Sequence, residues 1–195
     1  MKAYYERRAA EYDDWWLGTG LFANRHRPGW HEEAAALTRT LGALPPARTL
    51  DVACGTGFLT RHLRGKITAL DQSASMLELA RAKVPEGRFV QGDALELPFP
   101  DNSFERVMTS FFYGHLQKND RAAFLGEARR VASELVVVDS RLHDEAEPVG
   151  WQERVLNDGS RWQVYKRFFE PDALADELGG VRTLFGGRWF VVVQA

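Results

Sequence analysis

The chain has 195 residues, 45% of them hydrophobic, which is enough for one domain with a sizeable core and too few for two. Its 25 basic and 27 acidic residues give a net charge of −2 and are spread along the chain, which argues against tight binding to duplex nucleic acid. Apolar runs stay below the roughly 18 residues of a membrane span, and the charged start does not match a secretory signal. We therefore expect a cytoplasmic protein with neither a nucleic-acid nor a membrane partner. The single cysteine and the spacing of the five histidines predict no metal site.

The first 45 residues are predicted to form helices rich in aromatic side chains. Tyr5, Ala9, Tyr12 and Trp16 fall on one face of a helix, and a second helix is expected from about 29 to 41. Such an aromatic stripe either packs against the core or forms a lid over a ligand crevice. Both interpretations stay open at this point.

From Thr49 onward, short β-rich runs alternate with helix-period segments, which predicts a mostly parallel sheet covered on both faces. Ser73 is expected to cap the helix after the second strand, and Asn119 or Asp120 the helix after the fourth. The expected strands are 49–52, 67–71, 89–91, 104–110 and 135–138.

The C-terminal part is predicted to add a hairpin, a helix and two final strands. Asp158-Gly159 is typical of a two-residue turn, so a hairpin within 141–170 could cap the site. A helix is expected from Pro171 to Gly179-Gly180. Strands 181–185 and 188–194 would then pair antiparallel through a turn at Gly186-Gly187.

The segment from Asp51 to Gly57 predicts a strand that leads into a ligand-binding loop. Its glycines allow close approach of backbone and ligand, and positive φ angles in a strand-to-helix turn. A phosphate-binding P-loop would need a lysine that this segment lacks, and Thr60 weakens a dinucleotide fingerprint.

Two further carboxylates end the next two strands. Asp71 can accept hydrogen bonds from ribose hydroxyls, which fits both nicotinamide and adenosyl ligands. Asp93 can accept from an adenine amine, with Met76 and Leu95 as apolar faces for the ring. Asp93 could equally be a turn-forming residue after Gly92.

Together these segments resemble the class I S-adenosylmethionine-dependent methyltransferases. Four motifs in order carry the resemblance, namely residues 50–57, 69–77, 91–99 and 101–104. It implies a doubly wound α/β fold with a mostly parallel seven-stranded sheet and an antiparallel last strand (a Rossmann-like methyltransferase fold). The single domain, 1–195, would comprise an N-terminal helical lid (1–45), a cofactor-binding core (49–140), a cap hairpin (141–170) and a C-terminal helix with an antiparallel hairpin (171–195).

The resemblance also implies S-adenosylmethionine as cofactor, with S-adenosylhomocysteine as product. The glycine loop and Asp51 would hold the methionine part, Asp71 the ribose, and Asp93 with Ala94 the adenine. Tyr12 and Arg8 would approach the methionine carboxylate. The sequence departs from many members of the family at Ala53, where they carry glycine. The predicted cofactor-binding residues are Tyr12, Asp51, Ala53, Cys54, Gly55, Gly57, Asp71, Gln72, Met76, Asp93, Ala94 and Ser110.

The segment after the fourth strand is expected to face the methyl acceptor. Its aromatic residues Phe111, Phe112 and Tyr113, together with Tyr5, could stabilise a sulfonium by cation–π attraction. His115 is the candidate general base, although an isolated histidine is more often structural. The segment lacks the Asn/Asp-Pro-Pro-Tyr sequence with which similar enzymes hold base amines.

These observations predict a methyltransferase that acts on a small molecule in an aromatic-lined pocket. One alternative is a non-catalytic S-adenosylmethionine-binding or assembly protein, which would keep every motif. A nicotinamide-dependent oxidoreductase is the other, although no catalytic Tyr-x-x-x-Lys pair is found. The acceptor and the oligomeric state stay open.

Overall fold

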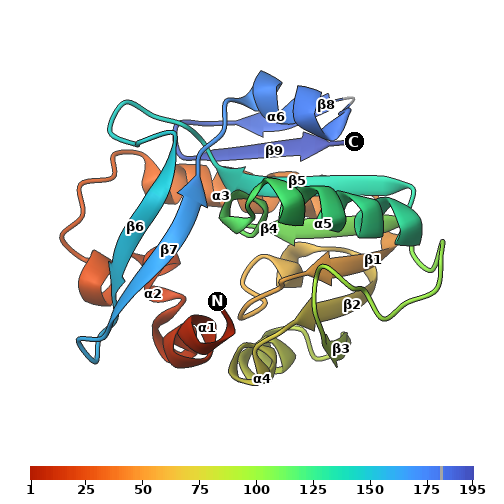
Figure 1. The fold of residues 1–195 in the computed structure, drawn as a ribbon, viewed down its shortest axis with the longest axis horizontal. Helices are drawn as coiled ribbons and strands as arrows, with labels where there is room; N and C mark the ends of the chain where they lie inside the picture. Colours follow the sequence, from red (N-terminus) through yellow and green to blue (C-terminus); the bar gives the residue numbers. More distant parts are fainter. Residues whose placement is uncertain (181) are drawn as a thin grey trace.

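The strands predicted from the apolar runs form one seven-stranded sheet in a computed structural model of the chain, which describes residues 1–180 and 182–195. The strand order is β3-β2-β1-β4-β5-β9-β8, and β9 is antiparallel to both of its neighbours (Figure 1). This confirms the predicted fold. Val181, the first residue of the predicted penultimate strand, lies outside the described residues. The strands are β1 Ala47–Val52, β2 Gly65–Asp71, β3 Arg88–Gln91, β4 Arg106–Ser110, β5 Glu134–Ser140, β8 Arg182–Gly186 and β9 Phe190–Gln194.

Helices cover both faces of the sheet because the central strands are apolar on both sides. Val137 of β5 packs in the core cluster that contains residues of α5 (Lys118–Val131) and α6 (Pro171–Leu178). Its neighbour Val136 packs in the cluster that contains residues of α3 (Trp30–Ala43). This alternation follows from the two-residue period of a strand. None of the helices in the described residues has the length and apolar character of a bilayer span.

Local signals account for several helix ends. Ser73 caps α4 (Ala74–Lys83) because its hydroxyl accepts a hydrogen bond from the Met76 amide at 3.2 Å. Pro171 opens α6, and Gly179 closes that helix with a φ of 63°. The predicted cap of α5, Asn119 or Asp120, was wrong by two or three residues, since Gln117 precedes the helix without a side-chain cap and Asp120 lies inside its first turn.

The N-terminal region folds into several short pieces and not into one long helix. It contains α1 (Lys2–Arg8), α2 (Asp14–Leu17) and 3-10 turns at Ala9–Glu11 and Gly20–Phe22. Because the helix is interrupted at Ala9–Glu11, the aromatic residues before and after this turn no longer share one helix face. Trp16 is 3% exposed in the core under α3, whereas Tyr5 and Tyr12 line cavities. The aromatic stripe is therefore divided between the core and the cavity walls.

The glycine loop is not followed by the expected helix. Only a 3-10 turn, Thr60–His62, stands between the loop and β2. Residues 58–64 are too few for an α-helix plus two connections, because β2 already begins at Gly65. A ligand at this loop consequently meets backbone amides of a turn and no helix terminus. The other short turn, Tyr113–His115, follows β4.

The predicted hairpin forms a separate two-stranded sheet of β6 (Val149–Val155) and β7 (Arg161–Arg167). Its loop has three residues, 157–159, because the Leu156 amide donates to the Ser160 carbonyl, and Gly159 takes the positive φ of 79°. Figure 1 shows this hairpin beside the N-terminal helices, away from β1 to β3. Leu156 and Val164 pack against Tyr4 of α1, so the two segments form one flank of the molecule.

The last hairpin turns two residues later than predicted. Gly187 donates its amide to the Phe190 carbonyl, which leaves Arg188 and Trp189 as the turn. The Glu33 carboxylate of α3 accepts hydrogen bonds from both turn amides, at 2.6 and 3.0 Å. This side-chain partner, distant in the sequence, decides the position of the turn.

Candidate active site

A cavity of about 230 Å³ lies at the carboxyl ends of β1, β2 and β4, where open α/β sheets bind their ligands. Tyr5 and Tyr12 of the N-terminal region close one side of it. We call it the cofactor cavity. Of the predicted cofactor residues, it is lined by Tyr12, Ala53, Gly55, Asp71, Gln72, Asp93, Ala94 and Ser110.

The glycine loop presents bare backbone to this cavity. Gly55 has a φ of 55°, and a Cβ at this position would lie 3.7 Å from the Tyr12 ring, so glycine is needed for conformation and not for space. Ala53 also has a positive φ, 57°, where an L side chain costs about 1 to 2 kcal/mol. The sequence departure at Ala53 therefore falls on a strained residue of the cavity wall.

Asp71 ties the loop to the next helix and still faces the cavity. Its Oδ2 accepts a hydrogen bond from the Gly55 amide and its Oδ1 from the Ser73 amide, both at 2.9 Å. Burial raises the pKa of this carboxyl, and the backbone donors act in the opposite direction. Each carboxylate oxygen keeps a second lone pair for a ligand hydroxyl.

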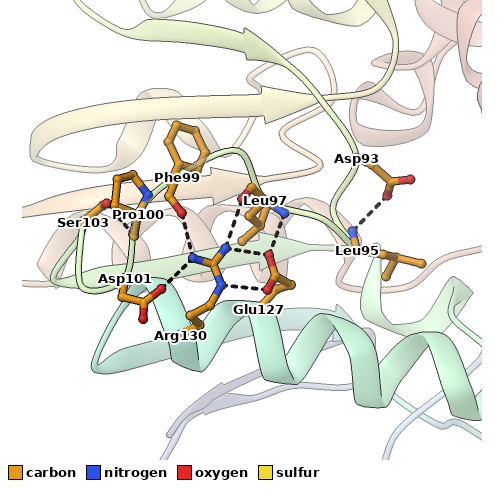
Figure 2. Close-up of polar contacts among 9 residues, drawn as sticks. All are labelled: Asp93, Leu95, Leu97, Phe99, Pro100, Asp101, Ser103, Glu127 and Arg130. Atoms are coloured by element: carbon orange, nitrogen blue, oxygen red, sulfur yellow. Dashed lines mark hydrogen bonds and ion pairs between the residues drawn. The ribbon is translucent and has the colours of Figure 1, made fainter.

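Asp93 forms a turn and lines the cavity at once. Its Oδ1 accepts from the Leu95 amide at 2.9 Å, as expected for a turn-forming aspartate (Figure 2). The two interpretations of Asp93 are therefore compatible, because the turn brings Ala94 and Leu95 to the cavity wall.

Residues of α5 clamp the loop that follows this turn. Figure 2 shows Arg130 donating to the carbonyls of Leu97 and Phe99 and to the Asp101 carboxylate, at 3.0, 2.7 and 2.9 Å. Glu127 binds the same guanidinium and accepts from the Leu97 amide at 2.7 Å. Sequence reasoning missed this pair. Its only signal was the i, i+3 spacing of opposite charges on one helix.

Four predicted cofactor residues do not line the cavity. Asp51 is fully buried and accepts a hydrogen bond from the Thr60 hydroxyl at 2.6 Å, and burial raises the pKa of its carboxyl to about 7. At Gly57 a Cβ would lie 3.1 Å from the Ala80 Cα, so this glycine permits α4 to pack on the loop. Cys54 and Met76 are 6% and 1% exposed.

A second cavity, of about 570 Å³, adjoins the first. The N-terminal region, the β6–β7 hairpin and the segment 143–147 form its walls. We call it the outer cavity. Its lining includes the predicted aromatic side chains of Tyr5 and Phe111, but it also holds several arginines that the prediction did not include. Four residues line both cavities: Tyr5, Tyr12, Phe111 and His115.

His115 stands in this shared wall as a neutral ring. Its Nδ1 lies 2.6 Å from the Tyr165 carbonyl oxygen, which can only accept, so Nδ1 carries the proton. Burial, and then the charge of Lys166, hold the pKa of His115 well below its usual 6.5. Nε2 is therefore the nitrogen that can accept a proton.

Two other predicted residues take different places. Tyr113 is fully buried and donates its hydroxyl to Glu177 at 2.8 Å, so it belongs to the core beside α6 and not to either cavity. Arg8 lies over the Tyr12 ring, 4.8 Å from its centre, and lines the outer cavity only. The predicted aromatic residue Phe112 lines the cofactor cavity but not the outer cavity.

Comparison with known proteins places this site in a family context. Residues 49–134 match the family described as a methyltransferase domain. The chain is 43% identical over 91 residues to a demethylmenaquinone methyltransferase of Thermotoga maritima, covering 44% of this chain and 39% of that protein. It is 33% identical over 143 residues to a 2-phytyl-1,4-naphtoquinone methyltransferase of Trichormus variabilis, covering 67% and 59%. The chain thus spans between 39% and 59% of the length of these curated relatives.

Solved structures match over nearly the whole chain. A DhpI-SAM-HEP complex superposes with a TM-score of 0.76 at 28% identity, covering 98% of this chain and 94% of that one. A DhpI-SAH complex superposes with a TM-score of 0.72 at 26% identity, covering 98% and 92%. The similarity therefore includes the N-terminal region and the hairpin as well as the sheet.

Proposed function

Because the chain belongs to the class I S-adenosylmethionine-dependent methyltransferases, we propose that it transfers a methyl group from S-adenosylmethionine to a small-molecule acceptor. One observation carries the proposal. Two cavities adjoin along a wall made of Tyr5, Tyr12, Phe111 and His115, and only the inner one holds the glycine loop and strand-end carboxylates of this family.

The residues of the cofactor cavity suit S-adenosylmethionine. Asp71 offers charged acceptors to vicinal hydroxyls of a ribose. Ala94, Leu95 and Leu116 give apolar faces for a planar base, with the Asp93 carboxylate at the rim. The backbone of Gly55 and the Tyr12 ring both line the cavity, so an aliphatic chain bound there would contact both.

The bound cofactor would supply a methyl group activated by attachment to a positively charged sulfur. The protein then has to orient two molecules so that the incoming nucleophile, the methyl carbon and the sulfur are nearly in line. Positioning of this kind gives effective molarities of about 10⁵ to 10⁸ M. Because Tyr5 and Phe111 line both cavities, their ring faces can stabilise positive charge at the boundary while excluding water.

His115 is proposed as the residue that receives a proton from the acceptor. Its Nδ1–H is held by the Tyr165 carbonyl, which fixes the ring and leaves Nε2 as the basic atom. The lowered pKa keeps the ring neutral at neutral pH, so it is ready to accept a proton as the nucleophile attacks. This role applies to acceptors whose nucleophilic atom carries hydrogen.

Calorimetric titration separates this proposal from its alternatives. S-adenosylhomocysteine is expected to bind the wild-type protein, whereas NADH at the same concentration is not. Preference for NADH would favour an oxidoreductase and contradict the proposal. A non-catalytic binding protein would bind S-adenosylhomocysteine but release none from S-adenosylmethionine in the presence of any acceptor, so product release measures catalysis itself.

A further inference from the structure

The outer cavity carries more positive charge than its aromatic lining predicts. Four arginines and one lysine line it, against two carboxylates, Glu145 and Glu147, that are both exposed. The basic residues are Arg8, Arg25, Arg27, Arg154 and Lys166. Three histidines, at positions 26, 115 and 143, also line it. The chain as a whole has a net charge of −2, so this concentration of cations is local.

The four arginines are not neutralised within the fold. Within residues 1–180 and 182–195, none of them lies within 4.0 Å of a carboxylate. Their polar contacts are to neutral groups. Arg8 donates to the Tyr4 hydroxyl at 2.7 Å, Arg27 to the Trp15 carbonyl at 2.9 Å, and Arg154 to the Gln152 amide oxygen at 2.6 Å. Lys166 differs, because it forms a buried ion pair with Asp139 at 2.6 Å.

The β6–β7 hairpin turns one face toward this cavity. Gln152 and Arg154 of β6 alternate with exposed residues, and on β7 the buried Val164 and Lys166 line the cavity, Val164 opposite Gln152 and Lys166 opposite Gly150. Burial, and then repulsion from Arg8 and Arg25, lower the pKa of Arg154. Arg8, Arg27 and Arg154 are half-buried, whereas Arg25 is exposed. Holding unpaired like charges together in a partly desolvated place costs free energy. A fold retains such an arrangement where a ligand of opposite charge compensates for it.

A further polar atom in the same wall lacks a partner. Nδ1 of His143 is buried and has no hydrogen-bond partner among the described residues. The ring packs edge-on against Trp189, 4.9 Å between centres, which fixes its orientation at the cavity. It adds a donor or acceptor to the arginine cluster.

We propose that the outer cavity binds a compact oxyanion, a phosphoryl-type or carboxylate group on the methyl acceptor, through Arg8, Arg25, Arg27 and Arg154. The inference rests on the proposed function, because it assigns a chemical class to that acceptor. Guanidinium groups match such anions with paired N–H donors. The aromatic side chains Trp15 and Trp30 then pack on the apolar remainder of the acceptor.

The same geometry disfavours a neutral polycyclic acceptor. A quinone ring with a long apolar chain would cover the arginines without offering them a charged acceptor. The demethylmenaquinone methyltransferase name belongs to a protein that matches 91 residues of this chain, and the family model covers residues 49–134, which exclude the arginines of this cavity. The acceptor class therefore follows from the N-terminal region and the hairpin.

Anion binding can be measured without knowing the acceptor. The protein is saturated with S-adenosylhomocysteine and titrated calorimetrically with inorganic phosphate, and separately with acetate, against sodium chloride at equal ionic strength. We expect saturable binding of phosphate, of acetate or of both, and the stronger of the two identifies the oxyanion type. Saturable binding of neither anion would overturn the inference.

Two variants locate the binding. Arg154→Gln should weaken the anion affinity by about tenfold or more, because it removes a charged donor. Arg161→Gln is the matched control, since it removes the same charge from the exposed face of the same hairpin. The anion affinity of this control should stay within about twofold of wild type. Equal loss in both variants, or in neither, would contradict the assignment.

The outcome is distinguishable from failure of the proposed function. If S-adenosylhomocysteine binds and the anions do not, only the acceptor class is wrong. If S-adenosylhomocysteine itself fails to bind, the methyltransferase proposal falls first. The thermal midpoint of Arg154→Gln should equal or exceed that of wild type, because the change relieves repulsion; a marked fall would assign Arg154 a structural role and overturn its role in binding.

Discussion

The two cavities differ in how the chain builds them. The cofactor cavity is assembled mainly from the ends of adjacent parallel strands, so many of its residues fall in short sequence segments at 53–55, 70–72 and 92–95. The outer cavity gathers segments that are far apart, with Arg8 and Arg25 from the N-terminal region and Arg154 from the hairpin. The first can be found by pattern, whereas the second exists only once the chain has folded.

The difference extends to charge. Acidic groups dominate the inner cavity, where Asp71, Asp93 and Asp120 line the wall, while arginines dominate the outer one. Between them stand three aromatic residues and His115. A ligand with a positive centre and one with a negative group would therefore be drawn to opposite sides of the same wall.

Replacing His115 should separate the two cavities most strongly. We expect His115→Gln to lower turnover by about 100-fold while leaving the affinity for S-adenosylhomocysteine unchanged, because only proton transfer is lost. Steady-state kinetics and calorimetry on the same preparation measure both. In wild type, the fall in rate toward acid should occur below pH 6.5, since the ring must be neutral to act. Full activity in the variant would remove the base from the mechanism.

Asp71→Ala tests the inner cavity alone. Loss of charged hydrogen bonds to the ribose should weaken binding of S-adenosylhomocysteine by about 1.5 to 3 kcal/mol. Because Asp71 also holds the Gly55 and Ser73 amides, the stability of the variant is measured in parallel by thermal unfolding. The affinity of Asp71→Asn for S-adenosylhomocysteine should lie between those of wild type and Asp71→Ala, because asparagine retains one carbonyl oxygen. Unchanged affinity in the alanine variant would contradict the assignment.

Asp51 is expected to affect stability and not the ligand. Its carboxyl pKa rises from 3.8 to about 7 on folding, so the stability it contributes is present below 3.8 and is lost as the pH rises through about 7. As the pH rises from 5 to 8, the free energy of unfolding, measured with urea, should therefore fall less in Asp51→Asn than in wild type. Parallel curves for the two proteins would show that this carboxyl does not titrate as described.

Loosening the clamp on the adenine side should have a smaller effect. Arg130→Gln removes the donors to Leu97, Phe99 and Asp101, and we expect a loss of cofactor affinity of about threefold as the loop gains freedom. Arg129→Gln, which loses one contact to the Leu178 carbonyl of α6, is the control. An effect at Arg129 as large as at Arg130 would show that the clamp has no special role.

The smallest change concerns the strained residue of the glycine loop. Ala53→Gly should stabilise the protein by up to about 1 kcal/mol, because relief of the positive φ exceeds the added entropy of the unfolded chain. Ala123→Gly in the exposed middle of α5 should destabilise by about 1 kcal/mol. Thermal unfolding of both variants gives the change in stability of each relative to wild type. Destabilisation by both substitutions would mean that Ala53 is not strained.

Sequence reasoning reached the mostly parallel seven-stranded sheet, its antiparallel last strand and much of the cofactor cavity because those features depend on local patterns. Ser73 and Pro171 mark helix starts, and Asp71 follows an apolar strand. It misplaced the helix after the glycine loop, because loop length and not glycine content decided the connection. It also assigned Asp51 to the ligand, although that side chain points to the buried side of its strand.

The outer cavity could not be predicted from the sequence, for a physical reason. The positions of Arg8, Arg25 and Arg154 in the sequence carry no common period or motif, and each resembles an ordinary surface arginine. Packing of Tyr4 against Leu156 and Val164, together with the hydrogen bond from the Asn157 amide to the Glu11 carboxylate, brings the N-terminal region to the hairpin and so creates the cluster. Such long-range contacts are not encoded in any short window of the chain.

A crystal structure of the protein with S-adenosylhomocysteine tests the central claim most directly. The account predicts the ribose at Asp71, the adenine against Ala94 and Leu95, and the sulfur at the wall shared by the two cavities, facing the arginines of the outer one. A ligand bound elsewhere, or with its sulfur turned away from Tyr5, Phe111 and His115, would contradict it.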